Sequence, residues 1–395
     1  MNRIAAVTAG LSLAFIGSSA TFAATINVPE DYATIQGAID ASSDGDVINI
    51  APGIYKESNL DPGGRPITIQ GTLNDDGSLV TTIDAQQIGS VFVCDSQEGE
   101  GTIIRNLMMT GGTGNQTYGF LHGGGIHCEF SHPTISNCTI IGHTAERGGG
   151  ISCLFSSPTI DNCIISDNTA DVGGGIYCFG NTSSPRISNC TISDNTAYSG
   201  GGISCASNKP VPNTPIISGC MIKSNVASQN GGGILCTNSN STVDACTISG
   251  NTANDGGGIY CYNSSPTINT CLIEGNSCNS NGCGISLYYL SIPTLINCTL
   301  ENNSFNWNIW IDWQTDSYLT LVSSDPPFSS AACCVSSGCA AMSSDDCTAL
   351  GGNWLGEGGS CDDCSASCSG DTNNDGVIDI EDLLTMLSNY GSVCP

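Results

Sequence analysis

The stretch GGGIYC at residues 173–178 is one of six copies of a Gly-Gly-Gly-Ile-x-Cys motif in this chain. Successive copies are 25, 25, 27, 31 and 25 residues apart, and an altered seventh copy follows after 26 more as Gly282-Cys283-Gly284-Ile285. A period in this range is typical of a solenoid, in which each repeat is one structural unit that buries its apolar side against its neighbours. The six copies begin at Gly123, Gly148, Gly173, Gly200, Gly231 and Gly256.

A second cysteine and an asparagine accompany each motif, always five residues apart. Side chains alternate along a strand, so the Ile and Cys of each motif share one face. Stacking the units places equivalent residues ~4.8 Å apart, which predicts inward columns of Ile and Cys and hydrogen-bonded ladders of turn asparagines. We therefore expect an all-β, parallel β-helix. The pairs are Cys163/Asn168, Cys190/Asn195, Cys220/Asn225, Cys246/Asn251, Cys271/Asn276 and Cys298/Asn303, and in the first unit His143 replaces the asparagine.

Both ends of a solenoid need a cap that covers the open core. At the N-terminal end, apolar residues with helical spacing predict a capping helix. At the other end we expect three tryptophans to have this role. The residues are Tyr32, Ile35, Ala38 and Ile39 for the helix, and Trp307, Trp310 and Trp313 for the far end.

The repeat GGGIYC with SDNTA resembles those of pectate-lyase-like and polymorphic outer-membrane-protein-like surface proteins. The segments 26–40 and 46–57 look like the N-terminal cap and first coil of the same superfamily. The resemblance covers residues 24–325 and implies a right-handed parallel β-helix. For an enzyme of this group it implies carbohydrate chemistry on an outer face, with aspartates, a basic residue and often calcium.

Residues 1–23 combine Arg3, an apolar run and a small-residue site at Thr21-Phe22-Ala23, which predicts a cleaved secretory signal. We expect a secreted or cell-surface protein with no transmembrane segment, because no later apolar run approaches the ~20 residues that a span requires.

The formal net charge of −28 argues against nucleic acid as a partner. A charged fraction of only 11% together with 50 glycines favours tight turns over disorder.

Most of the 24 cysteines fall into two groups. Thirteen occupy the two repeat columns, where they are buried thiols or, since neighbours one coil apart lie within disulfide reach, scattered disulfides. Eight follow from residue 333, and in an exported chain this even number predicts a disulfide framework of unknown pairing. The shift to Ser-Ser-Asp-Pro-Pro at 323–327 marks the boundary, so we expect a Cys-rich segment at 326–368 and a last module at 369–395.

The last module carries the strongest chemical motif, DTNNDGVIDIED at residues 371–382. Oxygen ligands stand at loop positions 1, 3, 5, 9 and 12, with glycine at 6, which is the pattern of a calcium loop. The alternative is an acidic turn before a helix. The predicted ligands are Asp371, Asn373, Asp375, the Val377 carbonyl, Asp379 and Asp382.

A calcium loop followed by one helix resembles a dockerin repeat. This resemblance implies docking of a secreted, glycan-degrading protein to a cohesin partner. Dockerins pair two such repeats and this chain shows one, with Cys368 and Cys394 on its flanks. Surface anchoring is therefore an alternative to cohesin binding.

The sequence does not assemble a catalytic site, and the catalytic residues are unknown. Asp161 and Asp244 point outward but lie three coils apart, roughly 14 Å at the strand spacing, which is too far for paired carboxylates. Asp167 and Asp194 occupy one turn position on adjacent coils, where they hold a cation or form a solvated turn. The four histidines occupy different repeat positions, so we expect them to point in different directions.

Outward aromatic residues on the Gly-Gly-Gly-Ile strands form a better surface candidate. Flat aromatic faces stack on sugar rings, although these rings also fit stacking on one another. We therefore expect an exported β-helix protein that binds extracellular polysaccharide. The alternatives are a polysaccharide lyase or glycoside hydrolase, and an adhesive or structural solenoid with a protein partner. The candidate carbohydrate-binding residues are Tyr177, Phe179, Tyr260, Tyr262 and Tyr288.

Overall fold

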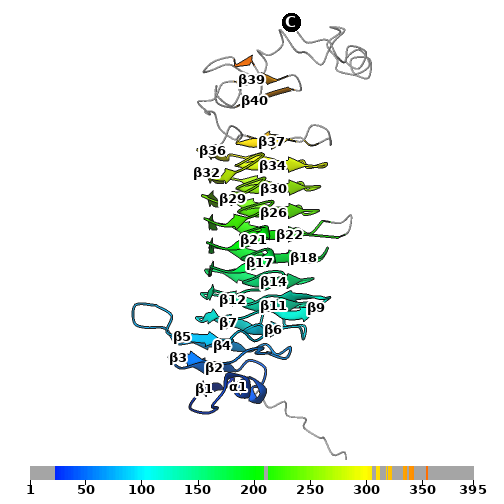
Figure 1. The fold of residues 1–395 in the computed structure, drawn as a ribbon. Coiled ribbons are helices and arrows are strands. Elements are labelled where there is room, and N and C mark those ends of the chain that lie inside the picture. The colour runs from blue at the N-terminus through cyan, green and yellow to red at the C-terminus, as the bar shows by residue number, and fades with distance from the viewer. Residues whose placement is uncertain are drawn as a thin grey trace, which may run out of the picture.

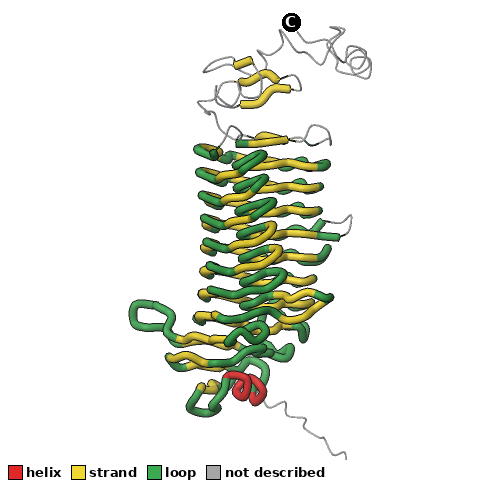
Figure 2. The backbone as a smooth tube through the Cα atoms, viewed as in Figure 1, coloured by secondary structure: helices red, strands yellow, loops and turns green. Residues whose placement is uncertain are grey.

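The computed structural model describes residues 23–208, 212–304, 308–311, 317, 319–322, 332–335, 338–341 and 353–354. These residues form a column of stacked coils whose strands lie across the column axis, with one short helix at the N-terminal end (Figures 1 and 2). The predicted calcium loop lies outside the described residues, as does all but the last residue of the predicted signal segment.

The coils contribute strands to three long parallel sheets of 12, 10 and 9 strands, which we name sheets A, B and C in the order in which a coil passes through them. Sheet A contains β1 (Thr25–Val28), β2 (Val47–Ile50), β4 (Thr68–Gly71), β7 (Ile103–Arg105), β12 (Thr134–Ser136), β15 (Thr159–Asp161), β19 (Arg186–Ser188), β23 (Ile216–Ser218), β27 (Thr242–Asp244), β31 (Thr267–Asn269), β35 (Thr294–Ile296) and β38 (Thr320–Val322). Sheet B contains β3 (Gly53–Tyr55), β5 (Thr81–Asp84), β8 (Met108–Thr110), β13 (Thr139–Ile141), β16 (Ile164–Ser166), β20 (Thr191–Ser193), β24 (Met221–Lys223), β28 (Thr247–Ser249), β32 (Leu272–Glu274) and β36 (Thr299–Glu301).

Sheet C carries the Gly-Gly-Gly-Ile motif and precedes the next strand of sheet A. It contains β6 (Phe92–Cys94), β11 (Ile126–Glu129), β14 (Ile151–Leu154), β18 (Ile176–Phe179), β22 (Ile203–Ala206), β26 (Ile234–Thr237), β30 (Ile259–Tyr262), β34 (Ile285–Tyr288) and β37 (Ile309–Ile311). A short sheet D lies between B and C and contains β17 (Thr169–Val172), β21 (Thr196–Ser199), β25 (Val226–Ala227), β29 (Thr252–Ala253) and β33 (Ser277–Cys278). The remaining strands are the hairpin β9 (Asn115–Thr117) and β10 (Phe120–His122), and the antiparallel set β39 (Ala332–Val335), β40 (Gly338–Ala341) and β41 (Asn353–Trp354).

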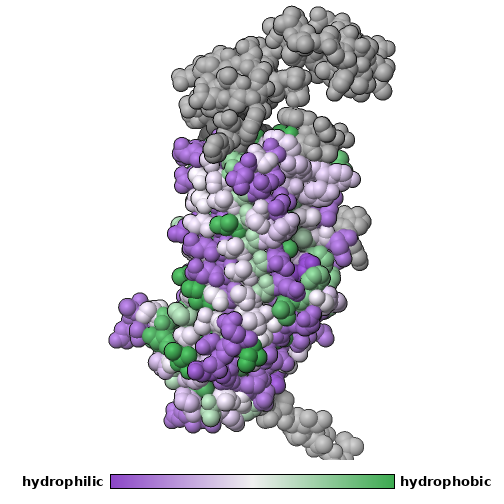
Figure 3. Space-filling model, in the orientation of Figure 1, coloured by the Kyte–Doolittle hydropathy of each residue, from purple (hydrophilic) through white to green (hydrophobic). Residues whose placement is uncertain are grey.

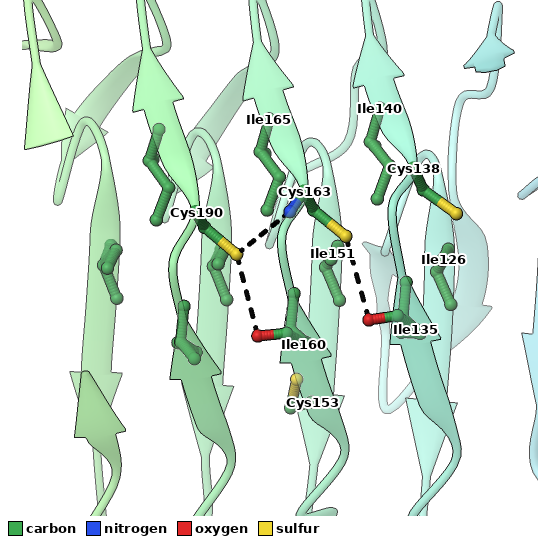
Figure 4. Close-up of a cluster of buried hydrophobic side chains, with 14 of the residues drawn as sticks. Ile126, Ile135, Cys138, Ile140, Ile151, Cys153, Ile160, Cys163, Ile165 and Cys190 are labelled. Atoms are coloured by element: carbon green, nitrogen blue, oxygen red, sulfur yellow. Dashed lines mark hydrogen bonds between the residues drawn. The ribbon is translucent and has the colours of Figure 1, made fainter. Parts of the chain in front are cut away.

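The parallel β-helix fold predicted from the repeats is confirmed, because equivalent residues of successive coils pair in register. Cys128, for example, pairs with Cys153, which pairs with Cys178. The inward Ile and Cys columns are buried, as Figure 4 shows for the coils around Cys163. Fourteen described cysteines are free thiols, namely the thirteen of the predicted columns and Cys94. Hydrogen bonding between neighbouring thiols and burial raise the pKa of Cys128 and Cys178 well above the ordinary thiol value, so these thiols stay protonated.

One disulfide interrupts this pattern, in the altered seventh repeat. Cys278 and Cys283 are joined across the turn between sheets D and C. The pairing was not expected from the sequence, where neither residue belongs to a cysteine column. The bond lies in the turn from β33, the last strand of sheet D, to β34 of sheet C.

The asparagine ladder is confirmed and runs through the turn that follows sheet B. The Oδ1 of Asn195 accepts from the backbone N–H and the Nδ2 of Asn168, both at 3.0 Å. Its Nδ2 donates to the Ile165 carbonyl and to the Oδ1 of Asn225, both at 2.9 Å. Because the side chain is fully buried, each bond satisfies a group that water cannot reach. The ladder comprises Asn168, Asn195, Asn225, Asn251, Asn276 and Asn303.

His143 starts the ladder and reproduces the bonding of an asparagine. Its Nδ1 accepts from the Gly112 N–H at 2.9 Å, and its Nε2 lies 3.0 Å from the Met109 carbonyl. Its backbone N–H donates to the Oδ1 of Asn168. This bonding requires the neutral ring with the proton on Nε2. Burial lowers the pKa of His143 to about 4.

The glycines of the motif satisfy two different demands. Gly173 has a φ of +68°, a left-handed conformation that turns the chain into sheet C. Gly174 has an ordinary φ, but a Cβ there would lie 2.5 Å from the Gly201 carbonyl oxygen of the next coil. Close stacking of the coils therefore excludes side chains at the second position.

The expected N-terminal cap is present as helix α1 (Ile35–Ala41), which covers the first coil with its buried residues Ile35, Ala38 and Ile39. Tyr32 was wrongly included in the stripe, because it precedes the helix and is 40% exposed. The tryptophan cap is wrong for Trp310, whose ring stacks on Tyr288 on the outer face of sheet C. Trp307 and Trp313 lie outside the described residues.

Replacing His143 by asparagine should reduce the acid sensitivity of the fold. The folded-state pKa of about 4 lies below the unfolded value of 6.5, so the unfolded chain binds more protons in this window. Stability therefore falls as the pH falls from 6.5 towards 4, by ~1.4 kcal/mol per pH unit for each such histidine. Urea unfolding at pH 7 and pH 5 should show a smaller loss for His143→Asn than for the wild type. The exposed His132→Asn is the control, and equal losses in all three proteins would contradict this account of His143.

Candidate functional site: an aromatic corner beside sheet C

The outward side chains of sheet C are less accessible than the sequence suggested. Tyr177 is only 2% exposed and Tyr260 only 8%. The expectation that these two rings form a surface platform is therefore wrong. The physical reason is that neighbouring side chains cover both rings. Arg147 donates to the Tyr177 hydroxyl at 2.8 Å, and Tyr288 stacks on Tyr260 at 5.2 Å. Burial raises the pKa of Tyr177, an effect that Arg147 opposes.

The other three predicted rings retain access to solvent and stack on neighbours. Tyr262 is 40% exposed and stacks on Tyr289, with ring centroids 5.3 Å apart. Phe179 is half-buried and stacks on Tyr177 at 5.9 Å. Tyr288 is half-buried and stacks on Tyr260 at 5.2 Å. The self-stacking alternative is thus observed, and sugar binding by these residues remains a prediction.

Two aromatic residues that the sequence reasoning missed form a further stack at the corner after sheet C. Phe130 and Phe155 lie with ring centroids 5.1 Å apart and planes 8° from parallel. Phe130 is 51% exposed, and Phe155 also meets Phe179 edge to face at 6.0 Å. The sequence contains the information that predicts this stack. Each phenylalanine follows its column cysteine by two positions, and the two phenylalanines are one coil apart.

Both phenylalanines adopt a backbone conformation that is unfavourable for a bulky residue. Their φ values are 49° and 48°, and the left-handed region costs an L-residue ~1–2 kcal/mol. Other coils place Gly180, Asn238 and Asn263 at the same corner with positive φ, as is usual for these residue types. The rings also depend on Gly180, since a Cβ there would lie 2.4 Å from Phe155. Residues held in such conformations cluster at functional sites.

The stacked rings form one wall of a pocket of about 570 Å³. The other lining residues are polar or small. They supply a carboxylate, an imidazole and two hydroxyl-bearing side chains. The lining consists of Gly99, Glu100, Phe130, His132, Phe155, Ser157 and Thr182.

Hydrogen bonds fix the polar wall of this pocket. The backbone N–H of Ser157 donates to His132 Nδ1 at 2.9 Å, so the neutral ring carries its proton on Nε2 and can donate it to a ligand. The hydroxyl of Ser157 donates to the Thr182 carbonyl at 3.2 Å and accepts from the Ser184 N–H at 3.0 Å. The wall is therefore set before any ligand arrives.

A buried carboxylate holds the loop that carries Glu100. Glu98 is fully buried and accepts from the Gly64 N–H at 2.8 Å, the Ser96 N–H at 3.0 Å and the Ser131 hydroxyl at 2.8 Å. Its backbone carbonyl accepts from the His132 N–H at 2.6 Å. This side chain thus connects three turns around the pocket.

The hairpin β9–β10 lies beside β11 of sheet C, where Thr117 contacts His127, and it brings two histidines together. The rings of His122 and His127 are 5.8 Å apart, so the expectation that all four histidines diverge is wrong for this pair. The hairpin, which the repeat does not encode, accounts for the difference. Burial lowers the pKa of His122 to about 3 and that of His127 to about 4. Among the described residues, no group of three His, Cys, Asp or Glu side chains is placed to hold a metal ion.

Arg147 fastens this hairpin to the solenoid. Its guanidinium lies 4.0 Å from the centre of the Phe120 ring and 5.5 Å from that of Tyr177. It also makes the hydrogen bond to the Tyr177 hydroxyl. A cation held between two rings gains both electrostatic and packing energy.

The aspartates considered for catalysis are arranged as the repeat predicts. Asp161 pairs in register with Ser188, then Ser218, then Asp244, so three coils separate the two carboxylates. Asp161 accepts from Ser188 and Asn189, which gives it a structural role. Asp167 and Asp194 are both exposed on adjacent coils. The predicted calcium ligands lie outside the described residues. In the described part of the chain, no helix has the length and apolar character of a membrane span.

Comparisons with known proteins agree with this architecture. A family model described as "Right handed beta helix region" matches residues 81–228 and 213–351. No curated protein matches the chain.

Among solved structures, the ORF18 protein of Geobacillus virus E2 is 13% identical with a TM-score of 0.53, over 78% of this chain and 62% of that one. The chain thus spans about three fifths of the viral protein. A pectin methylesterase from Aspergillus niger is 15% identical with a TM-score of 0.35, over 78% of this chain and 87% of that one. The A-module of a mannuronan C-5 epimerase from Azotobacter vinelandii is 14% identical with a TM-score of 0.35, over 74% of this chain and 95% of that one. At these identities the likeness concerns the fold alone.

Replacing Arg147 by methionine should loosen the hairpin while leaving the solenoid folded. The substitution keeps an apolar stem against Phe120 but removes the cation and leaves the buried Tyr177 hydroxyl without this donor, at a cost of ~1–3 kcal/mol. Hydrogen exchange followed by mass spectrometry should show faster exchange in 115–122. Arg186→Met, at an exposed arginine of sheet A, is the control. Unchanged exchange in the hairpin would show that Arg147 does not fasten it.

Proposed function

This chain belongs to the right-handed β-helix family, and we propose that it uses that scaffold to bind a neutral extracellular polysaccharide in the pocket beside Phe130 and Phe155. The observation that carries the proposal is the parallel stack of these two rings, of which Phe130 is 51% exposed, in a pocket whose other lining residues are polar or small. Both rings occupy backbone positions that favour glycine or asparagine, so the local stability of the fold does not explain them.

The chemistry of the pocket suits a sugar. An apolar wall with a few well-placed polar groups is the usual composition of a small-molecule site. The stacked rings offer a flat face to the C–H side of a pyranose, where burial of apolar surface favours binding. His132 Nε2–H is a donor for a sugar oxygen, and the Glu100 carboxylate is an acceptor for sugar hydroxyls.

Charge favours a neutral ligand over an acidic one. The chain carries 36 acidic and 8 basic residues, so its field repels polyanions. No lysine or arginine lines the pocket, whereas Glu100 does. An acidic sugar would therefore meet an unpaired carboxylate without a compensating cation.

The C-terminal module supports a role outside the cell. We propose that Asp371, Asn373, Asp375, the Val377 carbonyl, Asp379 and Asp382 bind calcium, since their spacing supplies the all-oxygen donor set that calcium prefers. Together with the N-terminal signal pattern, such a module would attach an exported protein to a cohesin-like or other surface partner. This attachment rests on the sequence motifs.

Replacing Phe155 by alanine should abolish retention on polysaccharide without unfolding the protein. The substitution removes the ring that stacks on Phe130 and leaves the backbone conformation with its Cβ unchanged, so thermal stability should change by less than ~2 kcal/mol. We would measure mobility in native gels that contain glucomannan, arabinoxylan, mixed-linkage β-glucan or, as the acidic comparison, polygalacturonate, and assay reducing ends and unsaturated products in parallel. Tyr198→Ala, at an exposed tyrosine of sheet D, is the control. Wild-type retardation by polygalacturonate alone, or by none of the four, would refute the proposal, and product formation would identify an enzyme.

Replacing Asp371 and Asp375 together by alanine should remove the C-terminal calcium. The substitutions remove two charged ligands from one loop. The affinity of the loop for calcium should therefore fall at least ~100-fold, since loss of even a supporting group lowers metal affinity by ~10–100-fold. Isothermal titration with calcium measures the stoichiometry directly. Asp161→Ala, an outward aspartate of the solenoid, is the control. Unchanged binding in the double variant would place the ion elsewhere.

A further inference from the structure

A second aromatic stack lies on the same edge of the solenoid as the Phe130–Phe155 pocket. Tyr262 and Tyr289 are 40% and 47% exposed, and their rings stack at 5.3 Å with planes 15° from parallel. Tyr289 follows β34 as Phe155 follows β14, and it too has a positive φ, of 43°. Tyr262, in contrast, is the last residue of β30 and pairs in register with Tyr288, so this stack joins a strand residue of one coil to a corner residue of the next. We name the two stacks the phenylalanine platform and the tyrosine platform.

The register gives the distance between the platforms. Strand β14 pairs with β18, β18 with β22, β22 with β26, and β26 with β30, which ends at Tyr262. Four steps separate Phe155 from Tyr262, or ~19 Å along the axis at the strand spacing. Because the coils stack in register, both platforms lie along one line parallel to that axis.

The corner residues between the platforms are small or polar. They are Gly180, Ser207, Asn238 and Asn263, in successive coils. Asn263 Nδ2 donates to Asn238 Oδ1 at 2.6 Å, and Asn238 Nδ2 donates to the Ser207 carbonyl at 2.9 Å. Unlike the buried ladder, these amides are at least partly exposed, so their remaining groups are available to a ligand. Two flat apolar surfaces are thus joined by four uncharged corner residues, two of which are hydrogen-bonding amides.

We propose that the two platforms bind one extended, neutral polysaccharide chain that runs along this edge of the solenoid. The inference rests on the proposed function of the phenylalanine platform. Along this edge an apolar surface, an amide-rich surface and a second apolar surface follow one another. This order complements a polymer in which every unit has a C–H face and hydroxyl groups. On the face shown in Figure 3, hydrophobic residues lie in small patches among hydrophilic ones, so this face carries no large apolar interface.

Affinity should therefore depend on chain length. A fragment that occupies one platform gains only that contact, whereas a longer fragment adds the second contact within the same complex, with a large gain in overall affinity. Once a fragment spans the ~19 Å between the platforms, its Kd should be at least ~10-fold lower than that of a short fragment.

The test uses the full-length protein and size-fractionated fragments of whichever polysaccharide retards it most among glucomannan, arabinoxylan and mixed-linkage β-glucan. Titration calorimetry would compare the wild type, Tyr262→Ala/Tyr289→Ala, Phe155→Ala and the control Tyr198→Ala. In the tyrosine double variant, we expect normal binding of short fragments and loss of the length-dependent gain. Far-UV circular dichroism and melting curves show whether each variant is folded, and the single variant Tyr289→Ala replaces the double variant if the latter unfolds.

The outcomes separate the two proposals. If short fragments bind through Phe155 but long fragments gain nothing, or keep their gain without the tyrosine platform, the extended-chain proposal is overturned and the phenylalanine site stands. If Phe155→Ala binds short fragments as the wild type does, or if no polysaccharide binds, both proposals fail. If the tyrosine variant loses only self-association in sedimentation velocity, the platform is a contact between copies of this chain and the extended-chain proposal is also overturned.

Discussion

The buried asparagine ladder controls the register on which the rest of the molecule depends. Each amide joins its own coil to its neighbours. Asn195, for example, accepts two hydrogen bonds from Asn168 and donates to the Ile165 carbonyl in the preceding coil and to Asn225 in the next. A coil that slipped by one residue would bury these amides without partners, and each unsatisfied group would cost ~1–3 kcal/mol. Register, in turn, places Cys on Cys and Ile on Ile throughout the core. The buried polar ladder thus specifies the stacking register of a core that is otherwise apolar.

The same register turns small sequence changes into surface features. Every coil repeats the corner after sheet C, so a single aromatic substitution in two neighbouring coils produces a stack with a spacing of about one strand. Phe130 and Phe155 show this directly. Farther along, Tyr289 at the same corner stacks on Tyr262, the last strand residue of the preceding coil. The interior remains constant because its columns are close-packed. Function on such a scaffold is therefore expected at corners, where a residue can change without disturbing the columns.

Departures from the repeat coincide with the most distinctive chemistry. The hairpin β9–β10 covers His122 and His127, and the Glu98 carboxylate fixes the loop beside the pocket. Both features lie in the N-terminal part of the solenoid, next to the phenylalanine platform. The acidic character of the whole chain also bears on this region, since it disfavours polyanions at a site that lacks a basic side chain.

The sequence alone determined the coil. The period of the glycine motif, the inward Ile and Cys and the fixed offset from Cys to Asn specify a stack of parallel strands, because only one register satisfies all three. His143 was even identified as the replacement for an asparagine. Tertiary structure decided which outward residues are accessible. Alternation placed Tyr177 and Tyr260 outside the sheet, yet neighbouring side chains cover them. The stack of Phe130 on Phe155 follows from the register, but only the tertiary structure shows that it borders a pocket. Tertiary structure also decided that His122 approaches His127 and that Cys278 bonds Cys283. These two contacts depend on the hairpin and on the altered seventh repeat, and alternation within a strand carries no information about the path of either.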